Sequence, residues 1–409
     1  MRSFVYGVLV VLALLLGFNL GLPLLSPDQT ESPRPNLEPQ LGTISESDNA
    51  LSFFSQGVRK MNLRGIEPRL FLQQDGWIAS EASRLTTENA EAMQLFIEGT
   101  RKTASRSKAR DPQYATFDAV NLEALPRDVQ GWHQLAELLL LRANLYLTSN
   151  DPTSAWRYYF LVWKAANQIR NANGSLIELD VGDSLAQLAL SSMRTAMRQS
   201  QFDDATWRKL LRDLQAQPLD NGALDESLKS ERRFFSLALD AASGKTPSQS
   251  LRIGVSSPLV RFLPRKYSLQ VQKTLETYTL WLEDIQKRAS NCPDAIATEP
   301  PNPPEFLTAN PLAANGIGNA LLTSWVPPYG LATRACKLEQ AYRATLIFMA
   351  LHATTALTNG IPPSNLAVLE GRYFEKLPKD PFALGKNFQW DINGKILRSA
   401  DGTGYSFEF

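Results

Sequence analysis

Residues 132–171 read WHQLAELLLLRANLYLTSNDPTSAWRYYFLVWKAANQIRN and carry the clearest fold signal in the chain. Apolar side chains recur at helical spacing in both halves of this stretch, which is typical of two amphipathic helices. Between the halves, residues 149–152 (Ser-Asn-Asp-Pro) interrupt the period, and Pro152 suits the first turn of a new helix. The stretch therefore predicts two antiparallel helices joined by a short turn, with apolar stripes that include Leu135, Leu138, Leu139, Ala155, Val162 and Ala166.

Small and aromatic residues alternate along the two facing stripes. Ala143 precedes Tyr146 in the first helix, and Ala155 precedes Tyr159 in the second. Small residues let two helices approach closely while an aromatic ring fills the gap, and this arrangement resembles a tetratricopeptide (TPR) hairpin. Only one copy of the pattern is legible. We therefore expect irregular, TPR-like helical hairpins and not a regular repeat array.

The helical pattern extends on both sides of this hairpin, from about residue 50 to about residue 290. Proline is then frequent from residue 293 to residue 330, which predicts an irregular connection between two domains. A last helical pattern follows this connection. The helices expected after the hairpin cover residues 176–198, 205–215, 224–242, 266–288 and 331–358.

The hydrophobic period changes from 3.6 to 2 in residues 386–409. Phe388, Trp390 and Ile392 alternate with polar residues, and Asn393-Gly394 is the usual pair of a two-residue type I′ turn. We predict a three-stranded antiparallel meander at the C-terminus. Such a small sheet needs the preceding helix to cover its apolar face.

The N-terminal residues 4–25 contain no charged side chain and, as a helix, are long enough to cross a bilayer core of about 30 Å. We predict a membrane anchor with Phe4, Leu12 and Leu16 in the bilayer. Arg2 precedes the run, so the positive-inside rule places the rest of the chain in the periplasm. A cleaved signal peptide is the alternative, but a small-residue cleavage site is missing. Residues 26–50 lack an apolar period and predict a disordered linker.

Charge and cysteine content restrict the possible partners. The chain has 42 Lys and Arg against 41 Asp and Glu, and this near balance argues against nucleic acid as the main partner. With two histidines in the chain, no metal site or cofactor is predicted. In an oxidising periplasm, Cys292 and Cys336 are expected to form a disulfide; two free buried thiols are the alternative.

Sequence motifs of catalysis are missing from the chain. It has no G-x-S-x-G, H-E-x-x-H, P-loop or paired C-x-x-C motif. His133 and His352 lie in helical patterns, where a histidine with local hydrogen-bond partners or a packed ring is the usual finding. No catalytic residue is nominated, and a carboxylate pair brought together by the fold remains an open alternative.

Aromatic residues crowd the second helix of the opening hairpin. They cannot all face one side, so this helix either lies between two others or presents some of them to a partner. Trp156, Tyr159 and Trp163 are the candidates for lining a groove that would hold a peptide, a glycan or a partner helix.

The turn motifs near the C-terminus resemble those of a known family. Residues 359–366 (NGIPPSNL), residues 377–382 (LPKDPF) and the aromatic hairpin resemble the C-terminal half of type II secretion pseudopilins. Most of residues 80–409 also looks like a broader group of uncharacterised bacterial membrane-anchored helical proteins. The resemblance implies a pseudopilin-like α+β domain. A prepilin peptidase site is missing, so polymerisation into a pilus is not expected.

These signals predict a mainly α protein with five segments: a transmembrane signal-anchor (1–25), a linker (26–50), a helical domain (51–292), a Pro-rich connection (293–330) and a pseudopilin-like α+β domain (331–409). The favoured function is a non-catalytic scaffold or adaptor, anchored in the bacterial inner membrane and bound to other envelope proteins. The alternatives are an envelope enzyme acting on peptidoglycan or another glycan, and a periplasmic ligand-binding protein.

Overall fold

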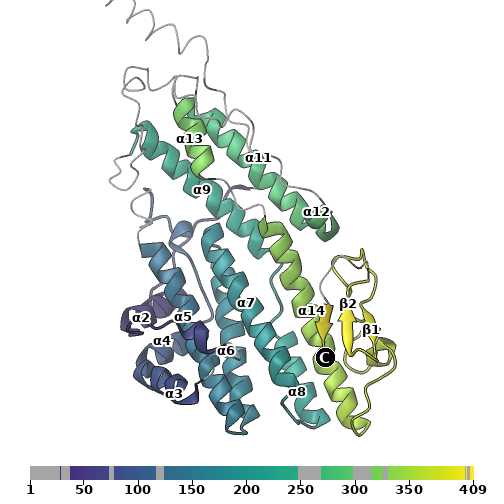
Figure 1. Ribbon diagram of the computed structural model, residues 1–409. Helices are drawn as coiled ribbons and strands as arrows, with labels where there is room; N and C mark the ends of the chain where they lie inside the picture. Colours follow the sequence, from purple (N-terminus) through teal and green to yellow (C-terminus); the bar gives the residue numbers. More distant parts are fainter. Residues whose placement is uncertain are drawn as a thin grey trace, which may run out of the picture.

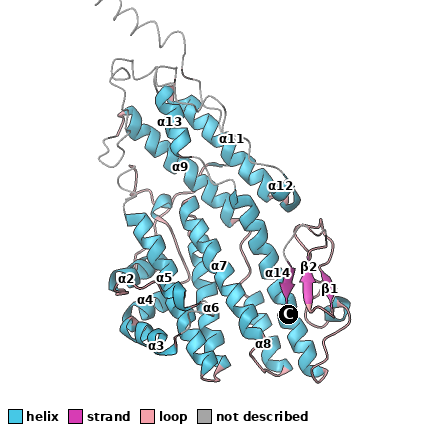
Figure 2. Cartoon of the chain, viewed as in Figure 1, coloured by secondary structure: helices cyan, strands magenta, loops and turns pink. Residues whose placement is uncertain are grey.

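Helices form most of the molecule, and one small sheet closes its C-terminal end (Figures 1 and 2). The computed structural model describes residues 28, 37–72, 78–116, 124–246, 269–297, 315–325, 330–400, 402 and 406–409. Within these residues the chain has twelve α-helices and a three-stranded antiparallel sheet, which confirms the prediction of a mainly α fold ending in a meander.

The predicted membrane anchor, with Phe4, Leu12 and Leu16, lies outside the described residues. Of the helices that are described, none has the length and apolar character needed to cross a bilayer.

The first half of the chain forms a layer of closely packed helices. Capping side chains mark the start of α2, α6, α7 and α8. The Asp151 carboxylate accepts a hydrogen bond from the Ser154 amide at the start of α6, and Asp203 accepts one from the Thr206 amide at the start of α8. The helices of this layer are α2 (Ala50–Lys60), α3 (Ala79–Glu88), α4 (Ala90–Thr100), α5 (Ala124–Thr148), α6 (Pro152–Arg170), α7 (Leu176–Met197) and α8 (Asp204–Gln215).

A second group of helices caps one end of this layer (Figure 1). It consists of α9 (Ala223–Ser243), α11 (Val271–Ala289), α12 (Cys292–Ala297) and α13 (Gly316–Ser324). The long helix α14 (Gly330–Leu357) starts beside α11 and α12 and continues along α7 and α8. Cys292 at the start of α12 forms a disulfide with Cys336 of α14, with the two Cα atoms 5.5 Å apart.

The predicted irregular connection contains helices α12 and α13. Asn315 has a left-handed φ of 62°, and its side-chain oxygen accepts hydrogen bonds from the Gln270 amide at 2.8 Å and the Thr274 hydroxyl at 3.0 Å. Gly318 lies against the same Thr274 hydroxyl, where a Cβ atom would overlap it. Asn315 and Gly318 thus hold α13 against α11. The proline count, which predicted an irregular segment, carries no information about such contacts. Residues 298–314, which hold most of the prolines, lie outside the described part.

The second half of the predicted linker is part of the folded body. Leu37 is buried in the same apolar cluster as α9 and α11. The Gly42 amide donates to the Arg110 carbonyl at 3.1 Å, and the Asn49 side chain donates to the Arg106 carbonyl at 2.9 Å. Residues 37–50 therefore differ from the expected disordered segment, because their few apolar and amide side chains have fixed partners.

Two apolar clusters make up most of the core, and neither follows the expected domain boundary at residue 331. The larger one joins α2–α8 to the middle of α14 and to the sheet, and includes Trp163, Leu190, Phe348 and Leu397. The smaller one joins α9, α11 and α13 to the start of α14, and includes Phe235, Tyr278, Leu282, Leu331 and Phe382. Since α14 contributes to both clusters, the C-terminal region does not have a core of its own.

The sheet consists of β1 (Gln389–Asp391), β2 (Ile396–Arg398) and β3 (Ser406–Glu408). Asp391 pairs with Ile396, so the first connection has four residues and the predicted two-residue type I′ turn is wrong. The Asp391 side chain explains the longer loop, because one of its oxygens accepts hydrogen bonds from the amides of Asn393 and Gly394, each at 3.1 Å.

Asp380 of the LPKDPF motif (residues 377–382) has a structural role. Its buried carboxylate accepts hydrogen bonds from Gln340 of α14 at 3.1 Å, from the Phe382 amide at 3.1 Å and from the Ala400 amide at 2.9 Å. The Ser399 hydroxyl donates a further one. One carboxylate thus holds the end of β2 against α14.

Replacement of Asp380 by Ala should lower the free energy of unfolding by about 3 kcal/mol, because it leaves several buried donors without an acceptor. Urea denaturation followed by circular dichroism measures this change. The matched control is Glu375→Ala, since Glu375 is exposed. Equal stability of the two variants would contradict the role assigned to Asp380.

Candidate functional site

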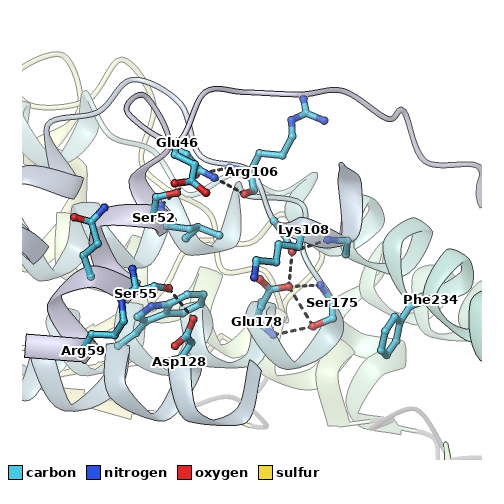
Figure 3. A pocket seen from close by; sticks show the side chains of 16 residues that line it. Glu46, Ser52, Ser55, Arg59, Arg106, Lys108, Asp128, Ser175, Glu178 and Phe234 are labelled. Atoms are coloured by element: carbon cyan, nitrogen blue, oxygen red, sulfur yellow. Dashed lines mark hydrogen bonds between the residues drawn. The ribbon is translucent and has the colours of Figure 1, made fainter. Parts of the chain in front are cut away.

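A polar cavity of about 170 Å³ lies where α2, α5, the start of α7 and residues 105–110 meet (Figure 3). Its lining is mixed in charge. Glu46, Asp128 and Glu178 provide carboxylates, and Arg59, Arg106 and Lys108 provide positive charges.

Glu178 is the most buried of these carboxylates, with 4 % of its surface exposed. One of its oxygens accepts hydrogen bonds from the Ser107 hydroxyl and the Ser175 amide, each at 2.8 Å. Ser175 and Glu178 form a capping box at the first turn of α7. Burial raises the pKa of Glu178 although these hydrogen bonds favour the charged form, and the negative charge of Glu231 raises it further.

Glu231 of α9 also binds at the N-terminal end of α7. One oxygen accepts from the Leu176 amide at 3.0 Å, and the other accepts from the Trp325 indole at 2.9 Å and the Tyr278 hydroxyl at 3.3 Å. Burial raises the pKa of Glu231 as well. The N-terminus of α7 therefore carries two buried carboxylates, the pairing that the sequence left open. Both are engaged by protein donors, and Glu178 is the one that lines the cavity.

The outer wall of the cavity is held by an arginine. Arg110 is 1 % exposed, and its guanidinium donates to the Glu226 carboxylate at 2.7 Å and to the Gln40 carbonyl at 3.4 Å. The Ser107 amide donates to the Ala172 carbonyl at 2.9 Å. These bonds fix residues 105–110 against α9 and against the connection between α6 and α7. The cavity is thus a preformed space whose lining suits a polar ligand with both donors and acceptors.

A wider groove of about 720 Å³ lies between α4, α6 and α8, and we call it the α6–α8 groove. Its floor is partly aromatic, and the rings of Tyr146 and Tyr158 stack at 5.6 Å. Its charged side chains are mostly basic. The residues that define the groove include Arg101, Tyr146, Arg157, Tyr158, Phe160, Leu161, Lys164, Phe202, Lys209 and Asp213.

The aromatic residues that the sequence nominated for a groove are buried. Trp163 stacks on Tyr342 of α14 at 5.4 Å, and Tyr159 donates to the Asn144 side chain at 3.0 Å. Trp156 packs edge-on against Trp207 at 5.8 Å and only its margin reaches the groove. Tyr159 and Trp163 do not line a groove, because α6 lies between neighbouring helices.

The groove instead uses the other face of α6. Arg157, Phe160 and Lys164 recur at three- and four-residue intervals, a mixed basic and aromatic pattern that the sequence analysis missed and that could have indicated this face. Of the two histidines, His352 is packed between the rings of Trp207 at 4.9 Å and Phe409 at 4.3 Å. Burial and, to a lesser extent, Lys395 lower the pKa of His352 to about 4, so its ring is neutral at pH 7.

Among the described residues, no group of three or more His, Cys, Asp or Glu side chains is arranged to hold an ion. Comparison of the chain with family models, curated proteins and solved structures gave no match in any of the three. The function must therefore be argued from the geometry of this chain alone.

Replacement of Glu178 by Gln should flatten the dependence of stability on pH. Because the folded protein raises the pKa of Glu178, it holds the proton more tightly than the unfolded chain does, and stability falls as the pH rises from about 4.3 towards the raised value. Gln does not titrate, so the fall should be smaller in the variant. Urea denaturation between about pH 4 and about pH 8 measures it.

The matched control is Glu46→Gln, which changes an exposed carboxylate on the rim of the same cavity. This control should follow the wild-type curve. A Glu178→Gln variant with the wild-type slope would show that burial does not perturb Glu178.

Proposed function

We propose that the protein is a scaffold or adaptor of the bacterial envelope, tethered to the inner membrane, and that it binds an acidic segment of a partner protein in the α6–α8 groove. The uncharged run at residues 4–25 supports the tether, and the resemblance of residues 331–409 to pseudopilins supports an envelope location. The pairing of α5 with α6 and of α6 with α7 supports the TPR-like description of the helical part, a design that presents grooves to partners.

The charge of the α6–α8 groove is the observation that carries this proposal. Arg101, Arg157, Lys164 and Lys209 line it against a single carboxylate, Asp213. None of these four cations forms an ion pair with another described residue. Complementary charge would be supplied by an acidic segment of a partner, which would improve both the rate and the specificity of association.

The aromatic floor adds apolar contact area to this charge. Tyr158 is half-buried and held by its stacking on Tyr146, whose other neighbour is the Arg142 guanidinium 5.5 Å from the ring centre. Phe202 is held by Trp207 at 5.2 Å. Side chains that are already fixed lose little entropy on binding, so the groove is prepared for an amphipathic helix or extended segment.

A second candidate, a periplasmic ligand-binding protein, is favoured by the partly open cavity beside Glu178. Its lining combines carboxylates with positive side chains, so it suits a small polar ligand that has both donors and acceptors. The groove offers more contact area and an unbalanced charge, so partner binding is the better supported function.

A photo-crosslinker placed at residue 158 should capture the partner in cells. The expected result is one adduct whose crosslinked peptide, identified by mass spectrometry, is net acidic. The double change Arg157→Glu and Lys164→Glu should lower the adduct yield about tenfold, since two rim charges account for about 1.4 kcal/mol.

The matched control reverses two exposed lysines outside the groove, Lys376→Glu and Lys386→Glu, in the chain with the same crosslinker. This control should keep the full yield. An adduct that survives reversal of the groove charges, or whose peptide is basic, would contradict the proposal.

A further inference from the structure

Ser184, His133 and Glu137 lie next to one another in a third pocket, which shares no lining residue with the two sites above. The Ser184 Oγ atom is 3.3 Å from His133 Nε2, and His133 Nδ1 is 3.0 Å from a carboxylate oxygen of Glu137. Ser184 comes from α7, whereas His133 and Glu137 are one turn apart on α5. We propose that these residues form a serine-hydrolase triad, a catalytic activity separate from partner binding in the α6–α8 groove.

Exposure decreases from the serine to the histidine to the carboxylate, as it should when the nucleophile must meet a substrate and the carboxylate only orients the histidine. Ser184 is exposed to solvent, His133 is 32 % exposed in its side chain and Glu137 is 4 % exposed. A carboxylate can only accept a hydrogen bond, so Glu137 holds the proton of neutral His133 on Nδ1. His133 Nε2 is then the acceptor that faces the Ser184 hydroxyl, as a general base must be.

A pocket of about 710 Å³ opens in front of the serine. Leu72, Leu188 and Leu338 give it an apolar wall that suits a small acyl group. The buried side-chain oxygen of Gln187, one turn after Ser184, has no hydrogen-bond partner among the described residues, and it can accept a donor from a ligand. These features fit a small acyl ester of a hydroxyl-bearing compound.

Positive charge lies in the same pocket. Arg334 and Lys337 of α14 line it, and Asp180 neutralises Arg334 only in part, at 3.1 Å across an exposed ion pair. Negative charge that develops on a substrate oxygen is stabilised by positive groups placed beside it. In this pocket the side chains of α14 would take the place of a backbone oxyanion hole.

The reaction balances as two acyl transfers. Ser184 Oγ attacks the ester carbonyl carbon while its proton passes to His133 Nε2, and the alcohol leaves with that proton when the ester C–O bond breaks. Water then attacks the acyl-serine, giving one proton to His133, and Ser184 leaves as the hydroxyl by taking this proton back. The net change is ester plus water to carboxylic acid plus alcohol, with Glu137 as a positioning residue.

The test uses the full-length chain purified in detergent, a fluorescent fluorophosphonate as the covalent probe and p-nitrophenyl acetate as the ester. Labelling forms a Ser Oγ–P bond and releases fluoride. The expected result is labelling at Ser184, located by peptide mass spectrometry on the unmodified protein. Ser184→Ala should lose labelling, and His133→Gln should reduce both labelling and hydrolysis by about 100-fold or more.

Ser83→Ala is the control, since Ser83 is an exposed serine on helix α3 and lies outside the pocket. It should keep full labelling. Glu137→Gln should slow labelling, and Glu137→Asp should restore part of the rate, which a purely structural role would not do. Absence of labelling in the wild type, labelling at another residue, or an unchanged rate in His133→Gln would overturn the proposal.

Discussion

The N-terminal turn of α7 is the constraint on which the rest of the structure depends. Glu178 and Glu231 bring two carboxylates to this turn with almost no exposure to water, where an unpaired charge would be very costly. The free amides of the helix end and the helix dipole favour negative charge there. Donors from Tyr278 of α11, from Trp325 directly after α13 and from Ser107 complete the set. Together with α7 and α9, five separate parts of the chain are held together by two side chains.

This arrangement decides where functional surfaces are available. The first turn of α7 is occupied by the cap, so Glu178 is held in place where it lines the cavity. Further along, α7 packs on α5 and α6, which leaves the other face of α6 to form the α6–α8 groove. The face of α7 that carries Ser184 meets His133 of α5 at the boundary with α14. Both proposed functions therefore depend on how rigidly α7 is held.

Local patterns predicted the helices well, because periodicity and caps such as Ser175 and Asp203 act within a few residues. Contacts between residues far apart in the chain could not be predicted from the sequence. Nothing near His133 indicates Ser184, and the aromatic run in α6 does not show that Trp163 stacks on Tyr342. The type I′ turn failed because Asp391 binds the loop amides and lengthens the connection. The contribution of α14 to both cores is likewise a long-range feature that the local pattern does not show.

Amide hydrogen exchange of Glu231→Gln tests the central claim that two carboxylates unite the helical layers. Gln keeps the size of the side chain but weakens its bonds to Leu176, Tyr278 and Trp325. The account predicts faster exchange in peptides from the start of α7, the middle of α11 and the end of α13 together, with α3 and α8 unchanged. Faster exchange confined to α9, or no change at all, would contradict it.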